Sequence, residues 1–180
     1  SVEFFGNVSG STITLGEGDD TLAIDGAVNT GSLTSGLSTT VQRSVFSLGE
    51  GANLVTIGKT VTSASVTAGA GADSLVIGGA ISATSFAVGA GNNRFFGAGN
   101  ITSSTLTAGA GNDSIQVNAD LLTDTISLGT GSDTLDVTGG VTGSSITIGG
   151  SSKVDVDGVV SGTTITAAAG TDTMLFGGRV

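Results

Sequence analysis

The sequence predicts an all-β protein folded as a single parallel β-solenoid of about eight coils, with about 20 residues in each coil. Three observations predict this fold. A glycine pair recurs at a nearly constant spacing, the residues after each pair alternate between apolar and polar, and apolar residues form columns when successive repeats are aligned. Alternation with a period of two is typical of strands and not of helices, so each repeat is expected to be one coil of short strands.

The first observation is the recurrence of a glycine-rich segment. It reads GEGDDTLAI at 16–24, GAGADSLVI at 69–77, GAGNNRFFG at 89–97, GAGNDSIQV at 109–117 and GTGSDTLDV at 129–137. If weaker returns at Gly149 and near Ala168 are included, five of the seven steps are 20 residues, and the first and last steps are 33 and 19 residues. The long step predicts a surface-loop insertion at about residues 29–42, which are rich in Ser, Thr and Gly.

The apolar columns predict the core and the way in which the coils stabilise one another. The clearest column contains Leu22, Val55, Leu75, Phe95, Ile115, Leu135, Val154 and Met174. One coil holds too few aliphatic side chains to offset the entropy of ordering it, so stacking must supply the difference. Because both ends of the sequence stop in mid-coil, we expect residues 1–180 to form one domain within a longer repeat array, or to pack end to end with neighbouring copies.

Composition excludes several classes of function. The chain has 180 residues, of which 32 are Gly, and Pro, Cys, His, Trp and Tyr are absent. Acidic residues outnumber basic ones 15 to 5, for a net charge of −10, which argues against binding to nucleic acid or to an anionic membrane. No apolar run is long enough for membrane insertion, and the first residues do not read as a signal peptide, so an export signal is expected elsewhere in a longer parent protein.

The glycine segment resembles the calcium-binding nonapeptide repeat of the RTX proteins, in a one-sided and degenerate form. The match runs through Gly109, Gly111, Asp113 and Ile115. In that family, aspartates in successive coils bind Ca²⁺ together with carbonyls of the glycine turn, so the resemblance implies calcium ions as cofactor and partner. The ligands implied by position are Asp20, Asp73, Asp113, Asp133 and Asp172.

The resemblance is partial, and a second interpretation of the same residues stays open. Asn53 and Asn93 occupy the aspartate position in two coils, and Lys153 is expected at or beside it in another. The family's first glycine is missing, and only one corner of each coil has the motif. The alternative is turn chemistry without an ion: Gly supplies a positive φ, and Asp or Asn bonds backbone amides in a stacked ladder.

Three further patterns in the sequence have simpler explanations than the functions they suggest. The glycine loops are followed by an acid and a strand, not by Lys and a helix, which argues against phosphate binding. Asp136 and Asp155 share an outward column, as two carboxylates of a glycosidase would, but the chain has no Trp or Tyr to hold a sugar, and we expect no enzyme. An outward Ser/Thr file, with Thr105 and Thr107 as one example, resembles the ice-binding face of some β-solenoid antifreeze proteins.

These observations predict a structural or adhesive repeat segment of a secreted bacterial protein that is located outside the cell, at the cell surface. A surface layer, a sheath or an adhesin is the expected setting, with calcium stabilising one edge of the solenoid. The alternative is a ligand-binding solenoid whose outward Ser/Thr file binds ice or glycan.

Overall fold

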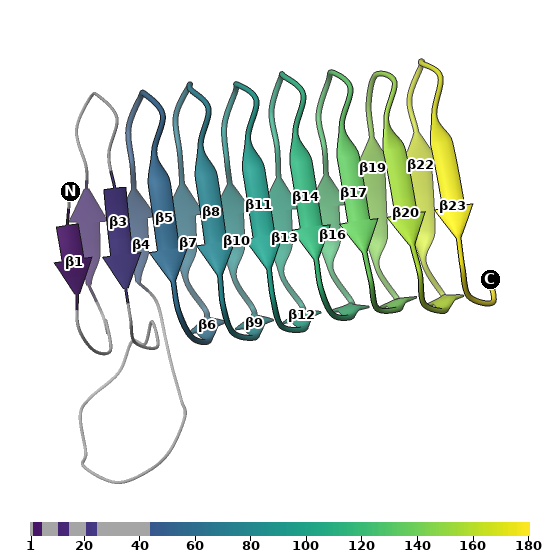
Figure 1. Ribbon diagram of the computed structural model, residues 1–180, viewed down its shortest axis with the longest axis horizontal. Coiled ribbons are helices and arrows are strands. Elements are labelled where there is room, and N and C mark those ends of the chain that lie inside the picture. Colours follow the sequence, from purple (N-terminus) through teal and green to yellow (C-terminus); the bar gives the residue numbers. More distant parts are fainter. Residues whose placement is uncertain (1, 5–10, 15–20, 25–43) are drawn as a thin grey trace, which may run out of the picture.

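The protein is a parallel β-solenoid, as the sequence predicts (Figure 1). The computed structural model describes residues 2–4, 11–14, 21–24 and 44–180, and these residues form three parallel sheets without any helix. The described part of the chain therefore has no helix that could cross a membrane. The expected insertion at residues 29–42 and the first candidate ligand, Asp20, lie outside the described residues.

The largest sheet, here called the front sheet, has nine strands among the described residues and faces the viewer in Figure 1. Its strands pair in the order of the coils, and every pair is parallel and in register. They are β1 (Val2–Phe4), β3 (Thr21–Ile24), β5 (Leu54–Ile57), β8 (Ser74–Ile77), β11 (Arg94–Gly97), β14 (Ser114–Val117), β17 (Thr134–Val137), β20 (Lys153–Val156) and β23 (Thr173–Phe176).

The back sheet lies behind the front sheet in Figure 1, and its strands run in the opposite direction. It has eight strands among the described residues. They are β2 (Thr12–Thr14), β4 (Val45–Ser47), β7 (Ser65–Thr67), β10 (Ser85–Ala87), β13 (Thr105–Thr107), β16 (Thr125–Ser127), β19 (Ser145–Ile148) and β22 (Thr164–Ala167).

A third sheet of short strands, here called the edge sheet, lies at the lower edge of the stack in Figure 1. Its six described strands are β6 (Val61–Thr62), β9 (Ile81–Ser82), β12 (Ile101–Thr102), β15 (Leu121–Leu122), β18 (Val141–Thr142) and β21 (Val160–Ser161). Each coil therefore passes from front sheet to edge sheet to back sheet, and the glycine-rich segment returns the chain to the front sheet.

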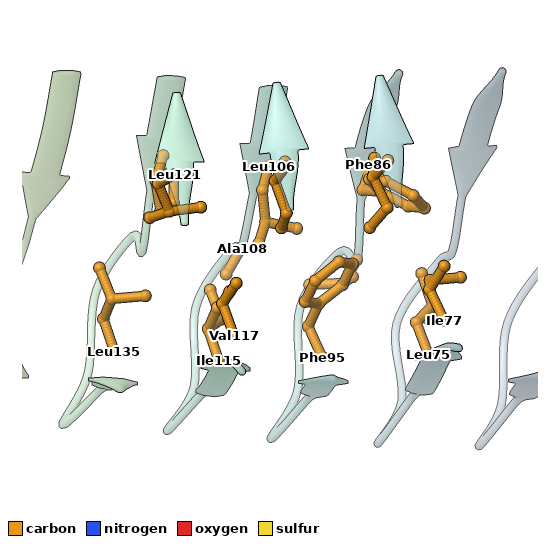
Figure 2. Close-up of a cluster of buried hydrophobic side chains, with 14 of the residues drawn as sticks. Leu75, Ile77, Phe86, Phe95, Leu106, Ala108, Ile115, Val117, Leu121 and Leu135 are labelled. Atoms are coloured by element: carbon orange, nitrogen blue, oxygen red, sulfur yellow. The ribbon is translucent and has the colours of Figure 1, made fainter. Parts of the chain in front are cut away.

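The predicted columns are the core of the solenoid. Ile115 pairs with Leu135 in the next coil, and Leu135 pairs with Val154, so the register survives the shorter step of 19 residues. Between residues 44 and 160, the inward side chains of the three sheets are almost completely buried and fill the space between the sheets (Figure 2). The rings of Phe86 and Phe95 meet edge to face with their centroids 5.1 Å apart. Stacking thus buries side chains that a single coil would leave exposed.

A feature that the sequence did not indicate lies where the edge sheet turns into the back sheet. Four residues without the freedom of glycine have a positive φ there: Ser63 (50°), Ala83 (48°), Ser103 (51°) and Thr123 (59°). In the next coils, the same position is occupied by Gly143 and Gly162, with φ values of 61° and 60°. This left-handed conformation is strained for residues with a Cβ atom, so these turns store strain in successive coils.

Replacing Ala83 by Gly is expected to stabilise the protein. Removing the Cβ relieves about 1 kcal/mol of left-handed strain, and the greater flexibility of Gly in the unfolded chain offsets about half of this gain. The expected rise in melting temperature is about 1–2 °C, measured by circular dichroism. Gly143→Ala is the matched reverse change and should lower the melting temperature. A lower melting temperature for Ala83→Gly would contradict the strain argument.

Candidate functional site

The candidate site is the row of glycine corners between the back and front sheets, at the upper edge of the stack in Figure 1. The second glycine of each pair has a positive φ, for example 133° at Gly111 and 138° at Gly131. A Cβ atom on Gly131 would collide with the backbone carbonyl oxygen of Gly111 in the coil before. Glycine is therefore required both by the turn and by the close approach of stacked backbones.

The corner brings the four predicted aspartates that the structure describes, Asp73, Asp113, Asp133 and Asp172, into one column, but their side chains point inward. The polar column consists of Asn53, Asp73, Asn93, Asp113, Asp133, Ser152 and Asp172. The exposed fraction is 1% for Asp73 and 2% for both Asp113 and Asp133, whereas Asp172 in the last coil is only half-buried. The column thus lies in the interior, beside the apolar core.

Each member of the polar column after Asn53 accepts a hydrogen bond from the backbone of the coil before it. The donor–acceptor pairs are Asn53 N to Asp73 Oδ1 (2.9 Å), Asp73 N to Asn93 Oδ1 (2.9 Å), Asn93 N to Asp113 Oδ1 (2.8 Å), Asp113 N to Asp133 Oδ1 (2.8 Å), Asp133 N to Ser152 Oγ (3.2 Å) and Ser152 N to Asp172 Oδ1 (2.9 Å). The ladder satisfies a buried N–H group in each coil, as buried backbone donors require.

The neutral members of the polar column also donate to their own glycine corner. Asn93 Nδ2 donates to the carbonyl oxygens of Gly89 and Gly91, both at 3.2 Å. Asn53 Nδ2 makes the equivalent bonds at 3.4 and 3.2 Å to the first and second glycines of its corner, and Ser152 Oγ donates to Gly149 O at 2.8 Å. The corner carbonyls therefore present acceptors to the column.

The ionised form of aspartate has no proton to offer these carbonyls. Oδ2 of Asp73 and Oδ2 of Asp113 are buried and have no hydrogen-bond partner. Because Oδ1 of each makes the same bond as Oδ1 of Asn93, the free Oδ2 takes the place of the Asn93 amide nitrogen. An acceptor thus replaces a donor, and a buried unpaired polar atom costs about 1–3 kcal/mol.

The electrostatic environment of these carboxyl groups favours the neutral form. Burial raises the pKa of Asp73 and of Asp113 above the ordinary aspartate value, while the hydrogen bonds from Asn53 and Asn93 oppose this rise. Burial also raises the pKa of Asp133, and hydrogen bonds from the Asp113 backbone and the Ser152 side chain oppose it.

The donor set falls short of the calcium site that the resemblance implies. Ca²⁺ takes about six to eight oxygen ligands, but Oδ1 of Asp113 and Oδ1 of Asp133 already accept backbone N–H groups. Within the described ranges, no group of three or more His, Cys, Asp or Glu side chains could hold a metal ion. These residues do not by themselves complete a calcium shell, and calcium binding stays a prediction.

Lys153, expected at or beside the aspartate position of its coil, lies beside that position. Ser152, not Lys153, occupies the polar column in its coil, because the one-residue deletion falls before it. Lys153 lies in β20 opposite Thr134, is exposed, and forms an ion pair with Asp155 at 2.8 Å. That contact raises the pKa of Lys153. Lys153 therefore acts on the outer face of the front sheet and not on the glycine corner.

A second polar ladder, which the sequence analysis missed, lies where the edge sheet meets the back sheet. Its hydrogen bonds run from Ala64 N to Thr84 Oγ1 (3.4 Å), Thr84 N to Ser104 Oγ (3.1 Å), Ser104 N to Asp124 Oδ1 (2.8 Å), Asp124 N to Ser144 Oγ (3.0 Å) and Ser144 N to Thr163 Oγ1 (3.3 Å). In the sequence, this ladder corresponds to a hydroxyl or carboxyl residue at the same position of successive repeats. The pattern is difficult to recognise because the chain has many other Ser and Thr residues.

Asp124 differs from Asp73 and Asp113 because both of its oxygens have donors. Oδ1 accepts the backbone N–H of Ser104 and Oδ2 accepts that of Leu122, each at 2.8 Å. Burial raises the pKa of Asp124, while these two bonds oppose the rise. Asp124 and Asp113 are equally buried, each with 2% exposure, but both oxygens of Asp124 accept hydrogen bonds, whereas Oδ2 of Asp113 has no partner.

Two outward faces carry the remaining predicted residues. Asp136 pairs directly with Asp155 on the front sheet, as the columns predicted, and Lys153 partly neutralises this pair. On the back sheet, the outward hydroxyl residues align in register from coil to coil, with Thr105 opposite Thr125 and Thr107 opposite Ser127. The hydroxyl file is interrupted by Val45, which is 43% exposed, and by Ala87.

No protein-family model, curated protein or solved structure matches this chain.

Proposed function

We propose that this chain is a structural repeat segment of a secreted protein, acting as a stiff spacer at the cell surface. The observation that supports it is the unbroken register of the three sheets, in which strands of successive coils pair residue by residue. Each coil contacts its neighbours through backbone ladders, a shared apolar core and a ladder of polar side chains. Such a quasi-one-dimensional stack resists bending along its axis.

The chemistry of the described surface agrees with a structural role. Its outward positions are mainly Ser, Thr and other small or charged residues, and the net charge of −10 favours solubility.

The location is tested by antibody labelling of intact source cells. An antibody raised against the folded chain is expected to label the surface of unpermeabilised cells or to detect the protein in the medium. A cytosolic marker that becomes accessible only after permeabilisation is the control. Labelling that also requires permeabilisation would contradict the proposal, because a surface spacer must lie outside the cell envelope.

The second candidate function is binding of glycan or ice by the back sheet. It is favoured by the in-register exposed hydroxyl groups of Thr105, Thr125, Ser145 and Thr164, on strands about 4.8 Å apart. Hydroxyl groups both donate and accept hydrogen bonds, as a polyol or an ice surface requires. The regular spacing of these hydroxyl groups from coil to coil is the feature that supports this alternative.

This candidate is tested by removing hydroxyl groups without changing side-chain shape. A Thr105→Val, Thr125→Val double variant is expected to lose binding in glycan-array and ice-growth assays if the back sheet is the binding face. Thr134→Val, on the front sheet, is the matched control and should keep it. If the wild type does not bind, or if the double variant binds equally well, the back sheet is not a binding face. Only the structural role would then remain.

A further inference from the structure

Two aspartates of the polar column, Asp73 and Asp113, each have a buried side-chain oxygen without a hydrogen-bond partner. Asn53, Asn93 and Ser152 each donate a hydrogen to the carbonyl oxygens of their own glycine corner. Asp73 and Asp113 lie at the same register, with the Oδ1 bond conserved and Oδ2 buried without a partner. Two Asn residues and one Ser thus show that the corner carbonyl oxygens accept a hydrogen bond from the side chain at this position of the coil.

We propose that Asp73 and Asp113 are proton-binding sites, each holding a proton on Oδ2 at pH values at which exposed aspartates are ionised. The protonated carboxyl group donates its O–H to the glycine-corner carbonyls of its own coil, as the Asn93 amide does. It still accepts the backbone N–H of the preceding coil through Oδ1. A neutral carboxyl group therefore satisfies every polar atom that the ionised group leaves unpaired.

The charged neighbours of both groups favour the proton. Glu50 acts on Asp73, and Asp133 in the next coil acts on Asp113, and both neighbours are negative. The residues that donate hydrogen bonds to the two carboxyl groups, Asn53 and Asn93, are neutral. Burial is the larger effect and acts in the same direction.

The consequence is a solenoid that acid stabilises. Because the pKa of each group is higher in the folded chain than its ordinary value of 3.8, the folded chain binds more protons between the two values. The contribution of these two groups to the free energy of unfolding is therefore greatest below the unfolded pKa and falls as the pH rises through the folded pKa. Above the folded pKa, the carboxylates are ionised and the stabilisation is lost.

The test is amide substitution of the full chain, with melting temperatures measured at pH 4 and pH 8 in the presence of chelator. Asp113→Asn and Asp73→Asn are expected to raise the melting temperature at pH 8 by about 3 °C each, because the amide nitrogen supplies the missing donor. The double variant should lose most of the decrease seen in the wild type between pH 4 and pH 8. Asp133 and Asp124 account for what remains.

Asp124→Asn is the matched control, since it removes the same charge at the same burial. There the amide nitrogen would face a backbone N–H, either that of Leu122 or that of Ser104. Its melting temperature at pH 8 is therefore expected to fall. Carbon-13 titration of the carboxyl groups gives a direct readout, with Asp73 and Asp113 expected to titrate above the ordinary aspartate value.

Two results would overturn the proposal. A lower melting temperature for both Asp73→Asn and Asp113→Asn at pH 8, with ordinary carboxyl titrations, would mean that the ionised groups are accommodated. A rise in wild-type melting temperature on adding Ca²⁺ that Asp113→Asn abolishes would mean that a cation, not a proton, neutralises Oδ2. Neither result bears on the structural role, which depends on the register of the coils.

Discussion

Gly111→Ala is expected to destabilise the protein by about 3 kcal/mol or more and to lower its melting temperature by about 6–12 °C. Gly111 has a φ of 133°, which residues with a Cβ rarely adopt. The new methyl group would also collide with the backbone carbonyl oxygen of Gly91. Backbone cannot move aside as a side chain can, so the whole corner must shift and strain the hydrogen bond from Gly111 N to Thr130 O. Denaturant unfolding followed by circular dichroism measures the loss.

The same substitution at Gly97 is the control and is expected to have the opposite sign. Gly97 is buried in the front sheet, and its φ is outside the positive range. A Cβ there would meet only side-chain atoms, the nearest being those of Phe95 and Ile101 at 3.4 and 3.5 Å. Gly97→Ala should therefore stabilise by about 1 kcal/mol, from the buried methyl group and a less flexible unfolded chain. Equal losses at both glycines would disprove the close-stacking argument.

Phe95→Ala is the second change with a large expected effect, a loss of about 3–5 kcal/mol in the free energy of unfolding. Phe95 is 1% exposed and its ring contacts Phe86 edge to face at an interplanar angle of 69°. In the same strand, the other inward position is Gly97, which has no side chain to fill the cavity (Figure 2 shows Phe95 among its neighbours). Urea unfolding measures the change in stability.

Phe96→Ala provides the matched comparison, because Phe96 is the next residue and faces outward. It is half-buried, and the Arg94 guanidinium lies 5.7 Å from its ring centre. Removing an exposed cation–π contact costs about 1 kcal/mol. A loss at Phe96 as large as that at Phe95 would mean that the inward and outward faces of the front sheet are assigned incorrectly.

The fold could be predicted because stacking repeats the same physical demand in every coil. Ile115 and Leu135, which the alignment places in one column, are paired residues of the front sheet. An inward position in one coil must remain inward in the next. The strained turns could not be predicted, because Ser63 and Ala83 have a left-handed φ that propensity would assign to Gly. In these turns, pairing in register with the neighbouring coils imposes a positive φ on residues that would otherwise avoid it.

The site was only partly predictable. Alignment of the glycine pairs found Asp73, Asp113 and Asp133 and placed them in one column, which the ladder of hydrogen bonds confirms. Sequence spacing does not say to which side of a corner a side chain points, so their inward direction and the free oxygens of Asp73 and Asp113 came only from the structure. Asp124 was missed because Ser fills the same position in both adjacent coils.

The short step at Ser152 has a consequence for how such a chain can evolve. The glycine corner absorbed the loss of one residue, yet Leu135 still pairs with Val154 and Val154 with Met174. Contacts reach only adjacent coils, so duplication or deletion of a whole twenty-codon unit in the gene would leave every surviving interface intact. The number of coils can therefore vary between related proteins. Within a coil, the gain or loss of single residues is confined to the corners.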